Sequence, residues 1–228
     1  MAAALPLTFL LIFSSCAFTV NAKKQTVEHE ADGYTEYMPY IRGAAVGMFQ
    51  NAANYAIKIG GRACNIVSVH DKNSISSLGN PRWFARVDKP HGKVPYHHIN
   101  VNPKITGVPD PHIPISESTA KIAGKLGKGL DAINKLAPYA MKALFLYDAY
   151  EVLYDYSNGK TQEVTEKLVT KAATYAGASY GASAGAAIGT CVFPVVGSMI
   201  GGIIGGAIGG GVGGSAGNAV NEIMKGDN

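Results

Sequence analysis

A long stretch near the end of the chain lacks charge. From residue 172 to residue 221 there are 50 residues without an Asp, Glu, Lys, Arg or His. The positive excess behind the net charge of +4 therefore lies in residues 23–171, with lysines at positions 23, 24, 121, 125, 128 and 135. A moderately basic body with an uncharged tail suits contact with an anionic surface. The excess is too small to single out nucleic acid.

Cysteine is scarce, and the three that are present exclude a disulfide-dense scaffold. Residues 1–22 carry no charge, hold an apolar run and end in Val-Asn-Ala, which predicts a signal peptide and a secreted protein. Cys16 leaves with that segment, unless it is the acylated residue of a lipoprotein. Cys64 and Cys191 then remain, and they permit either one disulfide or two separate thiols.

Familiar sequence signatures of metal binding are also missing. There is no H-x-H and no H-E-x-x-H. His97 and His98 are adjacent, so on a strand they point to opposite faces and do not serve one ion. We therefore expect no metal and no cofactor.

The first half of the mature chain predicts a small α+β domain over residues 23–101. Apolar residues from Ile41 to Ile59 follow helical spacing and end at a Gly-Gly pair, and a β-branched run follows. Residues 82–88 and 97–102 alternate with a period of two around a loop with Pro and Gly, which predicts an antiparallel hairpin.

One face of this hairpin gathers polar side chains. If the arms pair, His98 and Asn100 share a face with Arg82, Arg86 and Asp88, and His91 lies in the connecting loop. Histidine as general acid–base and arginine as a phosphate partner would suit metal-independent RNA cleavage, with His98, His91, Arg86 and Arg82 as catalytic residues. The alternative is a solvated polar sheet face with His97 in the core.

The second half is predicted to be helical. Residues 102–116 hold four prolines and form the expected linker. Residues 117–171 carry amphipathic helices, which we expect Pro138 to kink or divide, with a stop at Asn158-Gly159 and a further helix from Thr161. An uncharged segment at 172–221 and a polar tail at 222–228 follow.

The uncharged segment repeats glycine at every fourth position in two runs, separated by Pro194. On a helix this step advances about 40° beyond a full turn, so the glycines form a slowly rotating groove. Small residues at this spacing let helix backbones approach closely. We expect the two runs to pack as a helical hairpin, through the glycines at 177, 181, 185, 189, 197, 201, 205, 209, 213 and 217. Isoleucines between them would supply an apolar face away from the groove.

Residues 143–220, from "ALFLYDAYEVLYDYSNGK" through "PVVGSMIGGIIGGAIGGGVGG", resemble the glycine-zipper segments of bacterial toxins, contact-dependent effectors and two-peptide bacteriocins. In those segments a "YDxY…NG" helix end precedes Gly/Ala and Gly/Ile turns. The resemblance implies membrane insertion or delivery and brings no catalytic residues.

Three functions follow as hypotheses. The first is a secreted toxin-like or defence protein whose tail inserts into or associates with membranes, with anionic lipid as partner and the α+β region as a binding module. The second is a secreted nuclease, for which nucleic acid is the partner. The third is an extracellular structural protein that self-assembles through its glycine zipper. The predicted fold is α+β, with a small N-terminal helix and antiparallel hairpin followed by a mostly α-helical half that ends in the zipper hairpin.

Overall fold

The computed structural model describes residues 24–61, 64–192 and 196–226. The predicted signal peptide, Cys16 and Pro194 lie outside the described residues. The chain divides into two compact units, Met1–Met38 and Pro39–Asn228. The boundary between Met38 and Pro39 falls inside the first described helix. The sheet, the later helices and the contacts between them all belong to the second unit.

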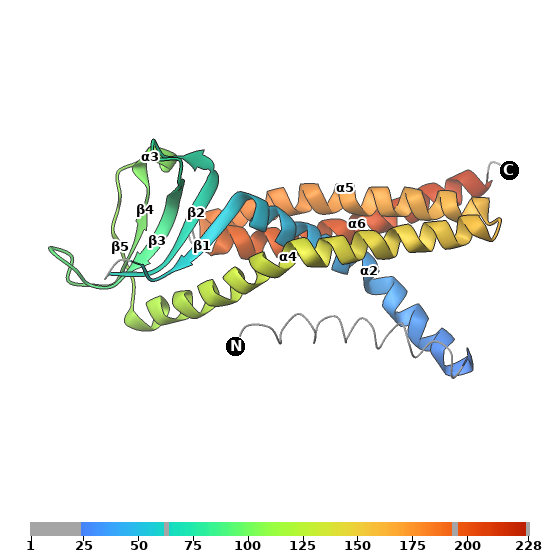
Figure 1. Ribbon diagram of the computed structural model, residues 1–228, viewed down its shortest axis with the longest axis horizontal. Coiled ribbons are helices and arrows are strands. Elements are labelled where there is room, and N and C mark those ends of the chain that lie inside the picture. The colour runs from blue at the N-terminus through green and yellow to red at the C-terminus, as the bar shows by residue number, and fades with distance from the viewer. Residues whose placement is uncertain (1–23, 62–63, 193–195, 227–228) are drawn as a thin grey trace. The chain divides into compact units, whose positions relative to one another are not determined.

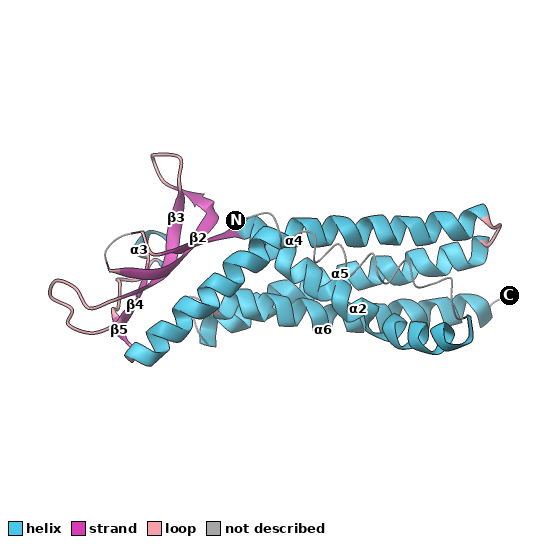
Figure 2. Ribbon diagram, turned by 60° about the horizontal axis from the view of Figure 1, so that its bottom comes forward, coloured by secondary structure: helices cyan, strands magenta, loops and turns pink. Residues whose placement is uncertain are grey.

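The elements follow one another in the order helix, sheet, helices (Figures 1 and 2). The helices are α2 (Lys24–Asn54), α3 (Pro103–Thr106), α4 (Glu117–Ser157), α5 (Thr161–Val192) and α6 (Gly197–Gly226). The strands are β1 (Tyr55–Ile59), β2 (Asn65–Ile75), β3 (Pro81–Asp88), β4 (His98–Val101) and β5 (Ile113–Pro114). The predicted fold class is confirmed.

The five strands form one antiparallel sheet in the order β1-β2-β3-β4-β5. The predicted hairpin is the pair β3–β4, in which Arg86 lies opposite Asn100 and Asp88 opposite His98. The proline-rich stretch 102–116 supplies α3 and the edge strand β5.

The prediction of a helix that continues to Ile59 is wrong. Helix α2 ends at Asn54, and the next five residues form β1. Their Tyr-Ala-Ile-Lys-Ile sequence alternates apolar and other side chains, so it suits a strand beside β2 as well as it suits a helix. Pairing with β2 decides the outcome, and Ile57 is buried as a result.

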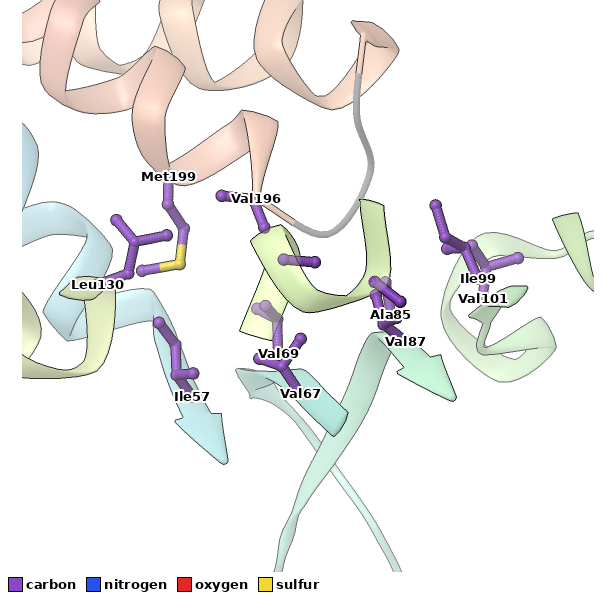
Figure 3. Close-up of a cluster of buried hydrophobic side chains, with 12 residues drawn as sticks. Ile57, Val67, Val69, Ala85, Val87, Ile99, Val101, Leu130, Val196 and Met199 are labelled. Atoms are coloured by element: carbon purple, nitrogen blue, oxygen red, sulfur yellow. The ribbon is translucent and has the colours of Figure 1, made fainter. Parts of the chain in front are cut away.

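One face of the sheet packs on α4. Val67, Val69, Val87 and Ile99 form a buried cluster with Ala120, Ala123 and Leu130 of α4. Val196 and Met199, at the beginning of α6, complete the same cluster (Figure 3). The beginning of α6 is therefore anchored to the sheet domain.

Helix α4 runs without a break through Pro138, so the expected division of this helix is wrong. A proline removes one backbone hydrogen bond, and the turns on either side remain paired. Figure 1 shows α4 changing direction along its length. The expected stop is confirmed, because Asn158 caps the helix and Gly159 takes a positive φ of 73°.

Candidate functional site

Helix α6 is built on a four-residue repeat, Ile-Gly-Gly-x, from residue 200 to residue 215. Ile200-Gly201-Gly202 is repeated at 204–206 and 208–210, and Val212-Gly213-Gly214 ends the series. Since each repeat advances little more than one helical turn, each of its positions defines a separate face of α6. The structure gives each of these faces a different neighbour.

The first glycine of each repeat faces α5. A Cβ built at Gly201 would overlap the carbonyl oxygen of Gly185, and one at Gly205 would overlap that of Gly181. The remaining pairs along this face join Gly189 to Gly197, Gly177 to Gly209, Ala173 to Gly213 and Thr170 to Gly217. The two helices are therefore in backbone contact over most of their length, and a side chain as small as alanine has no room there.

The second glycine of each repeat faces α2. Cβ atoms at Gly206 and Gly210 would overlap the backbone carbonyls of Gly43 and Pro39, and one at Gly47 would overlap that of Gly202. This second glycine row, at 202, 206, 210 and 214, is regular in the sequence, but no partner helix was predicted for it in the sequence analysis above. The signal was present in the small residues Gly43 and Gly47, which lie one four-residue step apart in α2.

The isoleucine of each repeat faces outward. Ile208 and Val212 are 58% and 66% exposed, and Ile204 is similarly open. We call Ile200, Ile204, Ile208 and Val212 the outer ridge of α6. On α5, Tyr180, Ile188 and Val192 are exposed at the same four-residue spacing. The hairpin thus keeps its backbone inside and its large apolar side chains outside.

Exposed apolar side chains continue on α4, where Tyr139, Phe145, Leu146, Tyr150, Leu153 and Tyr154 are all more than half open. Between α2 and α4 lies an apolar groove of about 510 Å³. It is lined by Phe49, Pro138, Met141, Lys142, Phe145 and Leu146.

Charged side chains join α2, α4 and α5 just before the uncharged segment begins. Arg42 contacts Asp148 through its Nη2 at 2.5 Å, and Lys171 contacts Asp148 at 2.5 Å and Glu151 at 2.7 Å. Lys167 contacts Asp155 at 2.5 Å. Burial alone would raise the pKa of Asp148, but hydrogen bonds from Arg42, Lys171 and Tyr175 outweigh burial and hold this pKa below its usual value. The cluster contains three cations and three carboxylates, so its charge is balanced.

The polar face of the sheet, on the side away from α4, is buried. Asp88, His98 and Asn100 are fully shielded from solvent. The Asp88 Oδ2 atom accepts a hydrogen bond from Asn100 at 2.8 Å and lies 3.0 Å from Arg86 Nε. The interpretation of this face as solvated, with His97 in the core, is wrong, because His98 is buried and His97 is half-exposed. The loop that follows β3 and the segment around β5 bring His91 and His112 onto His98.

The structure brings some of the proposed catalytic residues together. The ring centroids of His91 and His112 lie 5.0 and 5.2 Å from that of His98, and the His112 ring stacks on His98 while the His91 ring is tilted against it. Arg86 lies beside Asp88 and over the Trp83 ring. Arg82 is not part of this group, because it lies opposite Asp71 and donates to the Ile75 carbonyl.

The two cysteines of the described residues, Cys64 and Cys191, are free thiols. Cys191 is exposed near the end of α5. Cys64 is half-buried just before β2, where its carbonyl accepts a hydrogen bond from Lys89 N at 2.7 Å. Cys64, Asp88 and His91 offer donor atoms that all lie within 4.8 Å of one another, so they are the residues that could hold a metal.

The fold and the packed helices define a protein with a glycine zipper domain, and the comparisons agree. Residues 157–216 match the family described as the C13G5.2-like glycine zipper domain, and residues 39–133 match the C13G5.2-like N-terminal domain. The chain is 45% identical over 126 residues to the Caenorhabditis elegans protein named "Uncharacterized protein C13G5.2". That alignment covers 54% of this chain and 36% of the relative, so the chain spans about a third of the relative's length. No solved structure matches the chain.

Proposed function

We propose that the protein associates with lipid membranes through the apolar outer surface of its helices. The observation that carries this proposal is the outer ridge of α6, where isoleucines face outward while glycines occupy the inside. Large contiguous apolar surfaces are unfavourable in water and mark contact with lipid or with another protein. In lipid, association of helices relies on close backbone packing between small residues, which is the packing that α5 and α6 use.

The polar groups of the uncharged segment support contact with lipid. Hydroxyl groups in this segment donate to the carbonyl four residues earlier in their own helix, so they need no water. This holds for Thr174, Ser179, Ser183, Thr190 and Ser215. Helix α6 is long and apolar enough to cross a membrane, and it is the one described helix that meets this criterion.

The dimensions of the uncharged segment also fit a bilayer. Residues 172–192 of α5 and 197–221 of α6 measure about 31 and 37 Å at 1.5 Å per residue, and the hydrocarbon core is about 30 Å thick. The charged residues gather at one end of the hairpin, where Lys225 pairs with Glu166 at 3.1 Å. The lysines of α4 add attraction to anionic headgroups.

The connection between α5 and α6 lies at the end anchored to the sheet, because Val196 and Met199 belong to the buried cluster. In the described state, contact with lipid therefore uses the flank of the hairpin. Full insertion would first require these two side chains to leave the sheet. If the protein is a secreted toxin-like or defence protein, as the resemblance implies, release of these side chains would let the hairpin insert into a target membrane and permeabilise it.

The test is cosedimentation of the full-length protein with vesicles of phosphatidylglycerol or of phosphatidylcholine. We expect binding that is stronger to the anionic vesicles. The double variant I204S/I208S should bind at least about tenfold more weakly. It removes two apolar side chains whose contact with lipid would contribute about 1 kcal/mol or more each to binding. Leu78→Ser is the matched control, because Leu78 is exposed on the sheet domain and should leave binding unchanged.

Two results would overturn the proposal. One is a wild-type protein that binds neither vesicle. The other is a wild-type protein that forms concentration-dependent oligomers in water and binds no vesicles, while I204S/I208S forms no oligomers. That result would favour the self-assembling structural protein. We do not propose nuclease activity, because His98 is fully buried and does not reach a phosphodiester.

A further inference from the structure

Three potential metal ligands from separate parts of the sequence meet at one corner of the sheet. Cys64 precedes β2, Asp88 ends β3 and His91 follows in the next loop. Their donor atoms all lie within 4.8 Å of one another. Pairing of β2 with β3 produces this meeting, because Asn65 lies opposite Asp88 and Lys89 donates to the Cys64 carbonyl.

In His91 and His98, the hydrogen bond at Nδ1 makes Nε2 the ring nitrogen that can bind a metal. The Nδ1 atom of His91 donates to the Lys89 carbonyl at 2.8 Å, and that of His98 donates to the Tyr96 carbonyl at 2.9 Å. A hydrogen bond from one ring nitrogen to a carbonyl fixes the tautomer and leaves a lone pair on the other nitrogen. Metal-binding histidines characteristically have this arrangement.

The buried polar atoms of the corner are not all satisfied. Asp88 is fully buried, and while its Oδ2 is held by Asn100 and Arg86, its Oδ1 has no hydrogen-bond partner among the described residues. The fully buried His98 likewise leaves Nε2 without a partner in the described part of the chain. Because an unpaired buried acceptor costs about 1–3 kcal/mol, the unpaired Asp88 Oδ1 in a cluster with the Cys64 thiol and His91 indicates a ligand.

We propose that Cys64, Asp88 and His91 bind a zinc ion, with the ring of His98 packed against that of His91. Thiolate, imidazole and carboxylate are the ligands that zinc prefers. In a tetrahedral site with bonds of about 2.0–2.3 Å, neighbouring ligands are separated by about 3.3–3.8 Å. The donor atoms therefore need to close by about 1 Å, and Cys64 and His91 both lie outside the strands.

Binding deprotonates the Cys64 thiol, and this proton passes to solvent. Asn100 and Arg86 hold Asp88 Oδ2, so Oδ1 faces the metal as the free oxygen. The bound ion joins the beginning of β2 to the end of β3 and to the loop after it. This inference is independent of the membrane proposal, because the corner belongs to the sheet and not to the zipper.

The first experiment uses Cys64 and Cys191 as an internal comparison. The full chain is treated with iodoacetamide with and without zinc, and modification is mapped by mass spectrometry. Zinc should protect Cys64 and leave the exposed Cys191 reactive. Equal modification of Cys64 in both samples would overturn the proposal.

The second experiment measures affinity by competition with a chromogenic chelator, and cobalt is used as a spectroscopic probe of thiolate ligation. Cys64→Ser, Asp88→Asn and His91→Gln should each weaken zinc binding by at least about 100-fold and remove the thiolate-to-cobalt band or shift it. The matched controls Cys191→Ser and Asp110→Asn should bind as the wild type does. Unaltered zinc affinity in Cys64→Ser, which removes a half-buried thiol from outside the strands, would also overturn the proposal.

Discussion

The sheet domain and the glycine hairpin bury opposite parts of the chain. In the sheet, valine and isoleucine side chains fill the interior against α4, as Val67 and Val87 do. In the hairpin, the backbone itself fills the interior, and the side chains of the outer ridge of α6 lie outside. Stability in the first region depends on side chains that are present, and in the second on side chains that are absent.

This difference predicts that the stability of the two regions responds in opposite ways when the size of a buried side chain changes. Removing methyl groups should harm the sheet, whereas adding one should harm the hairpin. It also means that the helical bundle, with little apolar volume between α5 and α6, relies more on specific polar contacts. The charged cluster around Asp148 is the largest of these.

The largest effect is therefore expected for Asp148→Asn. The substitution leaves Arg42 and Lys171 with Glu151 as the one nearby carboxylate among the described groups, and a broken buried ion pair costs about 3–5 kcal/mol. We expect a loss of about 3 kcal/mol in the free energy of unfolding, measured in urea at pH 7. A loss below about 1 kcal/mol would mean that the cluster does not hold α2, α4 and α5 together.

The ion pairs of Asp148 also make the free energy of unfolding depend on pH. The pKa of Asp148 is lowered in the folded protein, so its stabilising contribution is present above about pH 4, the pKa of an unfolded aspartate, and declines as the pH falls through the folded value. The stability difference between the wild type and Asp148→Asn should therefore narrow in acid. Urea titrations at a series of pH values test this, and a constant difference down to pH 2 would contradict it.

A medium effect is expected for Val87→Ala in the sheet. Val87 is fully buried, and the loss of two methyl groups with the cavity they leave should destabilise the protein by about 2–3 kcal/mol. Thermal and urea unfolding followed by circular dichroism measure the change. If the loss were within about 0.5 kcal/mol, side-chain packing would not distinguish this region from the hairpin.

The smallest of the three changes in the free energy of unfolding is expected for Gly205→Ala. Its sign shows whether helix propensity or close backbone packing dominates at this position. Alanine favours a helix over glycine by about 1 kcal/mol, but here its Cβ overlaps the Gly181 carbonyl. We expect a net destabilisation of about 1–2 kcal/mol from the forced separation of the helices.

The matched control is Gly129→Ala in α4, where nothing described lies within 4 Å of the added Cβ. This variant should be stabilised by up to about 1 kcal/mol. If both glycine variants shift the urea midpoint in the same direction, close backbone contact is not what holds α5 to α6.

Periodicity alone predicted much of the fold. The period of two in residues 82–102 predicted the β3–β4 pair, and the step of four predicted the packed helices. Periodicity did not separate β1 from α2, because residues 55–59 suit either structure and the neighbouring strand decides. It also did not reveal the burial of Asp88 and His98, since the loop and edge segment that cover them have no regular pattern.

The candidate metal corner was beyond sequence reasoning for a related reason. Cys64 and His91 lie 27 positions apart and match no familiar ligand spacing. Only the register of β2 against β3 brings them together. The second glycine row of α6 was visible, but its partner in α2 lies some 160 positions earlier in the chain.

The Ile-Gly-Gly-x repeat of α6 also limits how this helix can change in length. Deleting or inserting four residues shortens or extends the helix and leaves each position of the repeat in its own row. Inserting a single residue moves every following isoleucine of the repeat into the row of the first glycine, so large side chains meet the backbone of α5. Length variants of α6 that still fold should therefore differ from this chain by multiples of four residues.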